Sequence, residues 1–392
     1  MENTESRKLN VAMICDPIGD YKAGVLVSAM RFSKLLAARG HKIIFIGARD
    51  KLNKENGFYH GIKTYRFRGV PLPKSDGWHL AFPTVTEIKE ILIKEKIDII
   101  HLWLPMSGAL VATKAARALG IKIVAHSHSQ PENLFSEAPK WIYGLLAKIW
   151  NKYLAWLYGK ADAIIYPSEL GREILHHLCG ADKHSVVISN GVNTEEFKPA
   201  DVGDFYERFN IPRNQFNLVY VGRLFPEKSV QTFIKALPLV LGKYPKSLAI
   251  IAGTGHLQTK LENLSVNLGV KDRVRFLGRV SDDDLIKVFN LATIFVSPSL
   301  AELEGMTVLE AMACGKPIIT TDAEMNAARF FVTDNGLLFE PENVAVLAEK
   351  IGILLADDKL RAKMSAVSLE KARQYDIHQS VIKLENLYYS LK

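Results

Sequence analysis

The sequence predicts two α/β domains, each built on a doubly wound, mostly parallel sheet. Short apolar runs that are typical of buried strands alternate with helix-length segments from residue 10 onward. The same alternation starts again near residue 215, and a chain of 392 residues is long enough for two cores. We therefore expect one domain over residues 1–200 and a second over residues 201–376.

Strands are expected where short runs rich in Val, Ile and Phe end at polar residues or glycines. A helix from Gly24 to Arg39 would join the first two strands in the right-handed arrangement that connects parallel neighbours. No short repeat or low-complexity segment interrupts the pattern. The expected strands are 10–15, 40–46, 97–101, 121–125 and 161–166 in the first half, and 217–221, 248–252, 274–277, 293–296 and 316–320 in the second.

The composition is that of an ordinary globular protein, with 48% hydrophobic and 23% charged residues. The three cysteines, Cys15, Cys179 and Cys314, lie far apart and form no C-x-x-C pair, so neither a disulfide framework nor a zinc site is indicated. The first residues are polar and acidic, whereas a secretory signal begins with basic and then apolar residues. We expect a cytoplasmic protein.

The positive charge lies in the first half of the chain. Residues 1–200 hold 27 Lys and Arg against 19 Asp and Glu, and residues 201–392 hold 23 against 23. All the tryptophans fall in the first half too: Trp78, Trp103, Trp141, Trp150 and Trp156. A basic surface with aromatic residues suits an anionic partner, either lipid headgroups or nucleic acid. No recognisable nucleic-acid motif accompanies the charge, so we expect no nucleic-acid partner.

The most informative segment runs from Ser299 to Pro317. It places two carboxylates, Glu302 and Glu310, on either side of Gly305, between an expected strand and an expected helix over 307–314. The first turn of such a helix exposes backbone N–H groups that attract a diphosphate. Glu302 would then lie in the loop over the ligand, and Glu310 would reach a polar group such as a ribose hydroxyl. The alternative is a solvated acidic loop before an ordinary helix.

Several nucleotide-binding motifs are absent. Neither half has the G-x-G-x-x-G fingerprint of dinucleotide enzymes, and the Walker lysine motif is missing too. Gly253-Thr-Gly255 follows an expected strand and permits close approach of a ligand to the backbone, although a tight turn would explain it equally well. The three aspartates 282–284 follow Ser281 and fit the capped first turn of a helix better than a metal site.

Six motifs occur together and in order over nearly the whole chain. They lie at 190–199, 222–228, 253–255, 280–285, 302–310 and 335–339. Together they resemble the retaining glycosyltransferases of family 4. This resemblance implies a GT-B fold, in which two Rossmann-like domains face a central cleft, and it implies that residues 377–392 form a helix that crosses back to pack on the first domain. It also implies a nucleotide-sugar donor and no cofactor or metal.

The resemblance assigns roles to individual residues. Arg223 and Lys228 would neutralise the departing diphosphate, Glu302 would contact the transferred sugar, and His128 would lie beside the sugar hydroxyls. His126 competes for this last place, but the register from Gly120 favours His128. The catalytic residues implied are therefore His128, Arg223, Lys228 and Glu302, and those that bind the donor are Gly24, Gly222, Gly253, Gly255, Arg279, Gly305, Met306, Thr307 and Glu310.

Two departures from the common family pattern narrow the acceptor. Two residues separate Glu302 from Gly305, where most members have the glutamate directly before the glycine. With the segments 128–132 and 71–83, this variant is similar to diacylglycerol glucosyltransferases. The segment 322–328 lacks the usual paired glycine, which leaves its donor contacts open. We expect transfer of a hexose, glucose, from a UDP-sugar to a membrane lipid such as diacylglycerol, giving an α-glycolipid. The alternative is a soluble or cell-envelope glycan acceptor.

The segment 140–160 supports a membrane acceptor independently. Lys140, Gly144, Lys148 and Lys152 recur every four residues as a narrow polar stripe, and apolar residues fill the rest of the helix. Basic residues interrupt it too often for a membrane span. An interfacial helix at the inner membrane face fits, and a buried core helix is the alternative. The residues expected at the acceptor or membrane are Trp78, Trp141, Lys148, Trp150, Lys152 and Trp156.

Overall fold

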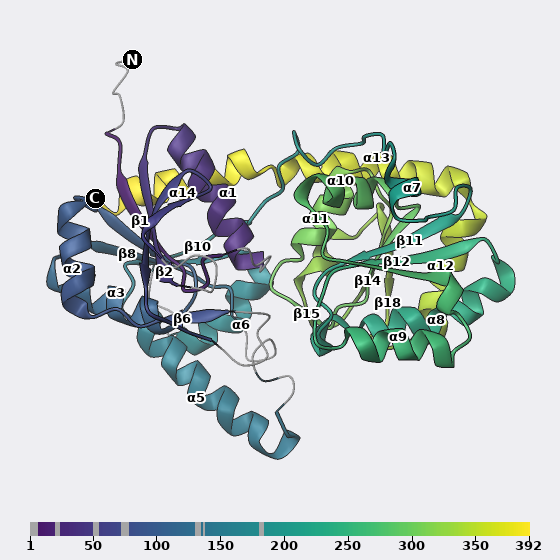
Figure 1. Ribbon diagram of the computed structural model, residues 1–392, viewed down its shortest axis with the longest axis horizontal. Coiled ribbons are helices and arrows are strands. Elements are labelled where there is room, and N and C mark those ends of the chain that lie inside the picture. The colour runs from purple at the N-terminus through teal and green to yellow at the C-terminus, as the bar shows by residue number, and fades with distance from the viewer. Residues whose placement is uncertain are drawn as a thin grey trace. The chain divides into compact units, whose positions relative to one another are not determined.

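The computed structural model describes residues 7–19, 24–49, 55–71, 78–129, 135, 138–179 and 184–392. It divides into two compact units, drawn in Figure 1. Unit 1 comprises Met1–Asn190 together with His378–Lys392, and unit 2 comprises Gly191–Ile377. The expected boundary after residue 200 lies inside unit 2.

Unit 1 is built on a sheet of eight strands in the order β10-β9-β8-β7-β1-β2-β4-β3. All neighbours are parallel except β3, which runs antiparallel to β4. The strands are β1 (Asn10–Ile14), β2 (Lys42–Ala48), β3 (Gly57–Tyr59), β4 (Ile62–Phe67), β7 (Ile99–Leu102), β8 (Lys122–His126), β9 (Ala163–Tyr166) and β10 (Ser185–Val187). A separate antiparallel pair joins β5 (Gly69–Pro71) to β6 (His79–Ala81).

The helices of unit 1 follow the expected alternation with the strands. They are α1 (Gly24–Ala38), α2 (Val85–Lys94), α3 (Ser107–Ala118), α5 (Lys140–Tyr158), α6 (Glu169–Cys179) and α14 (Ile377–Ser390), of which α14 returns from the far end of the chain. Glu385 of α14 bonds Arg39 and the ring of His41, with a distance of 2.7 Å between its Oε1 and His41 Nε2. The last helix is therefore held to the first strand–helix unit by a buried carboxylate.

Unit 2 has a six-stranded parallel sheet in the order β13-β12-β11-β14-β16-β18. Its strands are β11 (Phe216–Val221), β12 (Ser247–Ala252), β13 (Val274–Gly278), β14 (Ile294–Ser297), β16 (Ile318–Thr321) and β18 (Gly336–Phe339). A short parallel pair, β15 (Ala301–Glu302) with β17 (Met325–Asn326), lies outside this sheet. The predicted α/β class with two doubly wound domains is confirmed.

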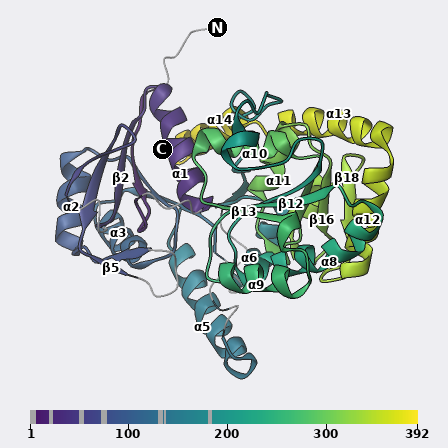
Figure 2. The ribbon, with the colours of Figure 1, turned by 45° about the vertical axis from the view of Figure 1, so that its right-hand side comes forward.

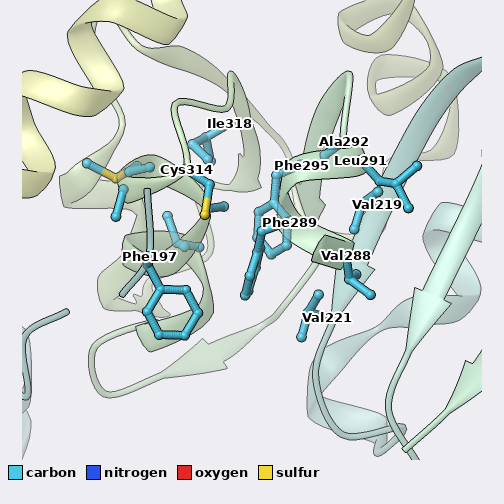
Figure 3. Packing of buried hydrophobic residues seen from close by; sticks show 14 of the residues in the cluster. Phe197, Val219, Val221, Val288, Phe289, Leu291, Ala292, Phe295, Cys314 and Ile318 are labelled. Carbon is cyan, nitrogen blue, oxygen red and sulfur yellow. The ribbon is translucent and has the colours of Figure 1, made fainter. Parts of the chain in front are cut away.

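The helices of unit 2 pack on both faces of its sheet. They are α7 (Phe205–Arg208), α8 (Val230–Lys243), α9 (Gln258–Asn267), α10 (Asp282–Leu291), α11 (Met306–Ala313), α12 (Val344–Ala356) and α13 (Asp358–Gln374), with single 3₁₀ turns η1 (Pro226–Lys228), η2 (Lys271–Arg273) and η3 (Ala327–Phe331). Val219 and Val221 of β11 face one apolar cluster, and Leu218 and Tyr220 face another. This alternation is what burial of a strand on both faces requires. Figure 3 shows the first cluster, in which Phe289 of α10 lies beside Phe295 of β14.

Both sheets reverse their strand order at one point. The chain first adds strands on one side, β11 to β12 to β13, and then crosses to the other side with β14. Unit 1 does the same, with β1, β2 and β4 on one side and β7 to β10 on the other. In doubly wound sheets, ligands bind outside the carboxyl ends of the strands at this switch point. The candidate sites are therefore expected after β11 and β14 in unit 2, and after β1 and β7 in unit 1.

Candidate active site

The switch point of unit 2 brings the predicted basic residues together with Glu302. Lys228 Nζ lies 2.7 Å from Glu302 Oε1, which also accepts a hydrogen bond of 2.9 Å from Ser299 Oγ. Lys228 ends the turn η1 after β11, and Glu302 lies in the short strand β15 after β14. Both side chains retain some exposure, 12% and 19%. The structure thus pairs a lysine with a carboxylate at the switch point of the unit 2 sheet.

Arg223 is held by a second ion pair. Its Nη2 lies 3.0 Å from Oε1 of Glu227, whose side chain is only 3% exposed, and its guanidinium lies over the ring of Phe225. Tyr220 Oη donates to the carbonyl of Arg223 at 2.8 Å. Burial raises the pKa of Tyr220 well above its usual value, so this hydroxyl stays protonated and available as a donor. The direction of the Arg223 side chain is therefore fixed by a buried carboxylate.

Glu227 is a residue that the sequence reasoning missed. Besides holding Arg223, it accepts at its backbone carbonyl a hydrogen bond of 2.8 Å from the N–H of Leu300. It therefore links the Arg223 turn to the loop that carries Glu302. The sequence does place a glutamate directly before Lys228, which could have indicated an ion pair with a nearby basic residue. Sequence alone, however, does not say which way such a side chain points.

The predicted glycines Gly222, Gly253 and Gly255 lie where two loops meet with no room for side chains. A Cβ at Gly253 would lie 1.8 Å from the carbonyl oxygen of Gly222, and one at Gly255 would lie 2.4 Å from that of Leu224. Gly253 also has a φ of +140°, which residues with a side chain rarely adopt. These glycines are explained by loop packing, and their donor contacts remain a prediction.

The segment from Gly305 forms the start of α11. Gly305 has φ +98° and a Cβ there would meet that of Ala328 at 2.5 Å, so the left-handed turn and the close approach both need glycine. Met306 and Thr307 begin the helix and are partly exposed, whereas Glu310 is 4% exposed. The first-turn N–H groups of a helix point away from it along its axis, as anion binding requires. The expected ribose contact of the buried Glu310 remains a prediction.

Asn326 joins the end of β16 to the turn η3 through its side-chain amide. The residue is fully buried, and its Nδ2 donates to the hydroxyl and carbonyl of Thr321 and to the hydroxyl of Thr320. Its Oδ1 accepts from the N–H of Ala328 at 3.1 Å, which caps η3. Asn326 lies in the segment 322–328, which the sequence left open. Its side-chain hydrogen bonds in the structure go to Thr320 and Thr321 at the end of β16 and to Ala328 in η3.

In unit 1, the switch point holds a buried aspartate that the sequence reasoning also missed. Asp16 follows β1 and is 2% exposed. Its carboxylate accepts hydrogen bonds of 3.1 Å from Gly108 N and from Ser107 Oγ at the start of α3. Burial raises its pKa to about 6 against the opposing effect of these hydrogen bonds. Asp16 thus joins the end of β1 to the first turn of α3.

His128, the predicted sugar contact, belongs to a stack of four rings. His101 and Trp103 come from the end of β7, and His126 and His128 from the end of β8. The ring centroids are 4.6 Å apart between His101 and Trp103, 4.6 Å between Trp103 and His126, and 4.2 Å between His126 and His128. Burial lowers the pKa of His101 and of His128 to about 3, and that of His126 well below its usual value. All three imidazoles are therefore neutral at pH 7.

The helix α5 is neither a free surface helix nor a core helix throughout. Its last turns bury Leu154, Leu157 and Tyr158, and Tyr153 Oη donates to Pro105 O at 2.9 Å. Its first turns extend away from the sheet of unit 1 in both ribbon views (Figures 1 and 2). The helix therefore is anchored at one end and exposed at the other.

The exposed part of α5 carries large apolar side chains. Their exposed fractions are 83% for Trp141, 58% for Leu145, 56% for Ile149 and 45% for Trp156. At helical spacing these residues form one stripe, with the exposed Lys148 and Lys152 along it. Trp150 differs from the expectation, because it is only partly exposed. It packs against Phe135 and Tyr153, so it does not lie on this stripe.

Three predicted residues remain to be placed. Gly24 begins α1, directly after residues outside the described part of the chain, Arg279 is exposed after β13, and Trp78 is partly exposed before β6. The capping prediction for Ser281 is confirmed, since its Oγ accepts from Asp284 N at 3.1 Å. Asp284 also accepts two hydrogen bonds of 2.9 Å from the guanidinium of Arg208, which makes a bidentate ion pair. Within the described residues, no group of three or more His, Cys, Asp or Glu side chains is placed to hold a metal ion.

No helix among the described residues has the length and apolar character needed to cross a membrane.

The comparisons with known proteins agree with this geometry. Residues 23–196 match the model for glycosyltransferase family 4, and residues 203–370 match that for glycosyl transferases group 1. The chain is 26% identical to the phosphatidylinositol N-acetylglucosaminyltransferase GPI3 subunit of Saccharomyces cerevisiae, over 96% of this chain and 79% of that protein. It is 25% identical to alpha-monoglucosyldiacylglycerol synthase of Streptococcus pneumoniae, over 79% of this chain and 70% of that protein.

A solved structure gives the same result for the fold. The Anabaena protein HepE in complex with UDP-glucose superimposes with a TM-score of 0.80 over 97% of this chain and 100% of that one, at 20% sequence identity. Two Rossmann-like units, together with the family matches, define the protein as a glycosyltransferase of the GT-B fold. The family 4 model covers the first half of the chain and the group 1 model covers the second half.

Proposed function

We propose that this enzyme transfers glucose from UDP-glucose to a membrane lipid such as diacylglycerol, with retention of the α configuration and without a metal ion. The single observation that carries the lipid acceptor is the exposed apolar stripe on α5, where Trp141 is 83% exposed. The relatives support it, because two of them are named for transfer to phosphatidylinositol and to diacylglycerol. The UDP-glucose complex of a protein with the same fold supports the donor.

The charges in unit 2 support the donor side of this reaction. Negative charge builds up on the diphosphate as the sugar leaves, and fixed cations in a site that excludes water stabilise it most. Arg223 and Lys228 lie at the switch point, and the start of α11 adds the positive end of a helix dipole. These groups supply the neutralising charge that a divalent ion would otherwise supply.

The carboxylates have separate tasks in this proposal. Glu302, which now pairs with Lys228, contacts the hydroxyls of the transferred sugar once Lys228 turns to the phosphate. Glu227 stays on Arg223 and keeps its guanidinium in place. Since none of these carboxylates is assigned as a nucleophile, the acceptor hydroxyl attacks on the face from which the diphosphate leaves. The departing phosphate then takes the hydroxyl proton.

The stripe on α5 supports contact with a bilayer. Tryptophans place their rings at the boundary between headgroups and acyl chains, and lysines extend their amines to anionic headgroups. Trp156 also lies under the amine of Lys160, at 5.1 Å from its ring centroid. The enzyme would thus lie on the inner face of the membrane with its acceptor nearby.

Binding to liposomes tests the membrane part of this proposal. We expect the wild type to float with vesicles that contain anionic lipid, and the double variant Trp141→Ala, Trp156→Ala to lose most of this binding. Leu239→Ala, which removes an apolar side chain that is 57% exposed in unit 2, is the matched control and should bind as the wild type does. Equal flotation of all three proteins would exclude α5 as the membrane contact.

The donor and acceptor are tested separately. Hydrolysis of a panel of nucleotide sugars, without any acceptor, should be fastest for UDP-glucose. Transfer to diacylglycerol in vesicles should then exceed transfer to soluble glycans. Turnover of UDP-glucose with a soluble glycan and none with diacylglycerol would favour the other acceptor class and leave the donor assignment intact.

A further inference from the structure

The ring stack in unit 1 ends on a residue from the opposite end of the chain. Tyr388 of α14 is fully buried, and its Oη lies 2.6 Å from Nδ1 of His101, which is also fully buried. His101 is the far end of the stack from His128: its ring lies 5.5 Å from His126 and 4.6 Å from Trp103. One hydrogen bond therefore connects α14 to the group of rings that includes the predicted sugar contact.

Few other hydrogen bonds orient these rings. Within the described part of the chain, both ring nitrogens of His126 and Nε2 of His128 and His101 are buried and have no hydrogen-bond partner. Trp103 Nε1 donates to Met13 Sδ at 3.3 Å. Face-to-face contact keeps the ring planes nearly parallel but lets each ring slide or turn within its plane, because stacking is less directional than a hydrogen bond. The bond from Tyr388 is thus the strong directional contact at the His101 end of the stack.

This bond also couples the tautomer of His101 to the direction in which the Tyr388 hydroxyl points. Burial keeps the pKa of Tyr388 well above its usual value and that of His101 near 3, so a neutral phenol meets a neutral imidazole. When the phenol donates, Nδ1 of His101 accepts and its proton resides on Nε2. Loss of the hydroxyl leaves Nδ1 buried without this partner, and the ring is then free to change its tautomer or its tilt.

We propose that Tyr388 and His101 are positioning residues that hold the ring of His128 in its plane, acting through Trp103 and His126. Neither residue is assigned contact with substrate. The consequence for catalysis rests on the proposed function, in which His128 contacts the sugar. Small displacements of such a group have large effects on rate, so a tilt of His128 would slow the sugar transfer more than it weakens binding of the nucleotide.

The test replaces Tyr388 by Phe, which keeps the buried ring and removes only the hydroxyl. Tyr389→Phe is the matched control, since this neighbouring tyrosine on α14 makes no hydrogen bond through its hydroxyl within the described residues. Histidine-selective ¹⁵N labelling reports the tautomer and ring environment of each imidazole, and spectra of His128→Gln and His101→Phe assign the two signals. His101→Phe is also the second test variant, because it keeps a ring in the stack without the bond.

We expect Tyr388→Phe to shift the ring signals of both His101 and His128, and His101→Phe to shift those of His128, whereas Tyr389→Phe leaves them unchanged. The kcat with a nucleotide sugar should fall about tenfold in both test variants, with the Kd for UDP unchanged. Unshifted His128 signals in folded Tyr388→Phe and His101→Phe would overturn the proposal, even if thermal stability fell. A wild type without activity on any nucleotide sugar would contradict the proposed function instead, and the His128 signals would still decide the positioning role.

Discussion

The two switch points of this protein use opposite chemistry. In unit 2, Arg223 and Lys228 pair with Glu227 and Glu302, and the cations remain partly exposed. In unit 1, the ends of β7 and β8 carry a stack of neutral rings that includes His128. Both groups of residues lie at the carboxyl ends of parallel strands, at or next to the point where each sheet reverses its strand order. The fold therefore fixes where each site lies, and the residues after the strands determine what it can do.

The difference fits the proposed function, in which a diphosphate leaves and a sugar is transferred. The leaving diphosphate needs permanent positive charge, and arginine and lysine carry it at every physiological pH. In the proposed function the sugar hydroxyls need groups that accept or donate hydrogen bonds without adding charge, and neutral imidazoles can do this. The four predictions that follow test this contrast.

The largest effect is expected at the cations of unit 2. Lys228→Ala should lower kcat for UDP-glucose turnover by about 10²–10³-fold, because it removes a fixed charge at the developing diphosphate. The matched control is Arg213→Ala, which breaks an exposed ion pair with Glu207 in the same unit. Steady-state kinetics should show near wild-type rates for the control. A loss below fivefold in Lys228→Ala would mean that the charge in unit 2 does not serve the leaving group.

The next largest effect tests whether the loops of unit 2 depend on close packing. Gly253→Ala places a Cβ against the carbonyl of Gly222 and strains a backbone with φ +140°. We expect a loss of about 1–3 kcal/mol in stability of unit 2 and weaker UDP binding, measured by differential scanning calorimetry and titration. Gly242→Ala is the control: it lies in α8 with open space around it and should stabilise the helix by up to about 1 kcal/mol.

Mild acid should destabilise unit 1 more than unit 2. The folded pKa of His101 is about 3 against an ordinary 6.5, so the unfolded chain binds more protons below pH 6.5. The stabilising contribution of the neutral ring is thus present above pH 6.5 and is lost as the pH falls. Asp16, with its pKa raised to about 6, acts in the opposite sense and gains stability as the pH falls from about 6. Three histidines with lowered pKa values have a larger effect than one aspartate with a raised pKa. The free energy of unfolding of unit 1 should therefore fall by about 1.4 kcal/mol per pH unit for each extra proton that the unfolded chain binds.

Hydrogen exchange with mass spectrometry measures this for each unit in one sample. Between pH 7.5 and 5.5, after correction for the intrinsic rate, peptides from β7 and β8 should lose protection. Peptides from β11 and β14 are the internal control, because these two strands contain no histidine. Equal changes in both units would contradict the contrast between a neutral and a charged site.

The smallest effect is expected at Glu227. Glu227→Gln keeps the size of the side chain but removes the charge that holds Arg223, so kcat should fall several-fold, less than in Lys228→Ala. Measurement of kcat and of the Kd for UDP distinguishes a loss of positioning from a loss of binding. The conservative variant Glu227→Asp, which retains the charge, should recover part of the rate. A variant with full activity would show that Arg223 needs no such support.

The sequence predicted most of the central strands and the residues at their ends. Apolar runs such as 217–221 predict β11 because burial on both faces leaves little choice of residue. It missed β4, in which exposed and buried residues alternate, and the short edge strands β3 and β10. Strands of this kind are too short or too polar to be distinguished from loops by composition.

Partnerships across the fold were beyond the sequence for a different reason. Asp16 and Tyr388 each act through a contact with a residue that only the fold brings near, Gly108 for Asp16 and His101 for Tyr388. The helix α5 was predicted with two alternatives, buried or interfacial. The structure buries one end and exposes the other, because the exposure of a helix depends on what packs against each turn, and the interfacial role of the exposed end stays a prediction.

The position of α14 in the chain has a consequence for synthesis. Unit 1 contains residues 378–392, which the ribosome makes only after all of unit 2. During translation, the sheet of unit 1 lacks the helix that supplies Glu385 and Tyr388 until synthesis is complete. All residues of unit 2 are made before that helix. Unit 2 is therefore expected to complete its folding first, although it comes second, and residues 1–190 produced alone would expose the apolar surface that α14 covers.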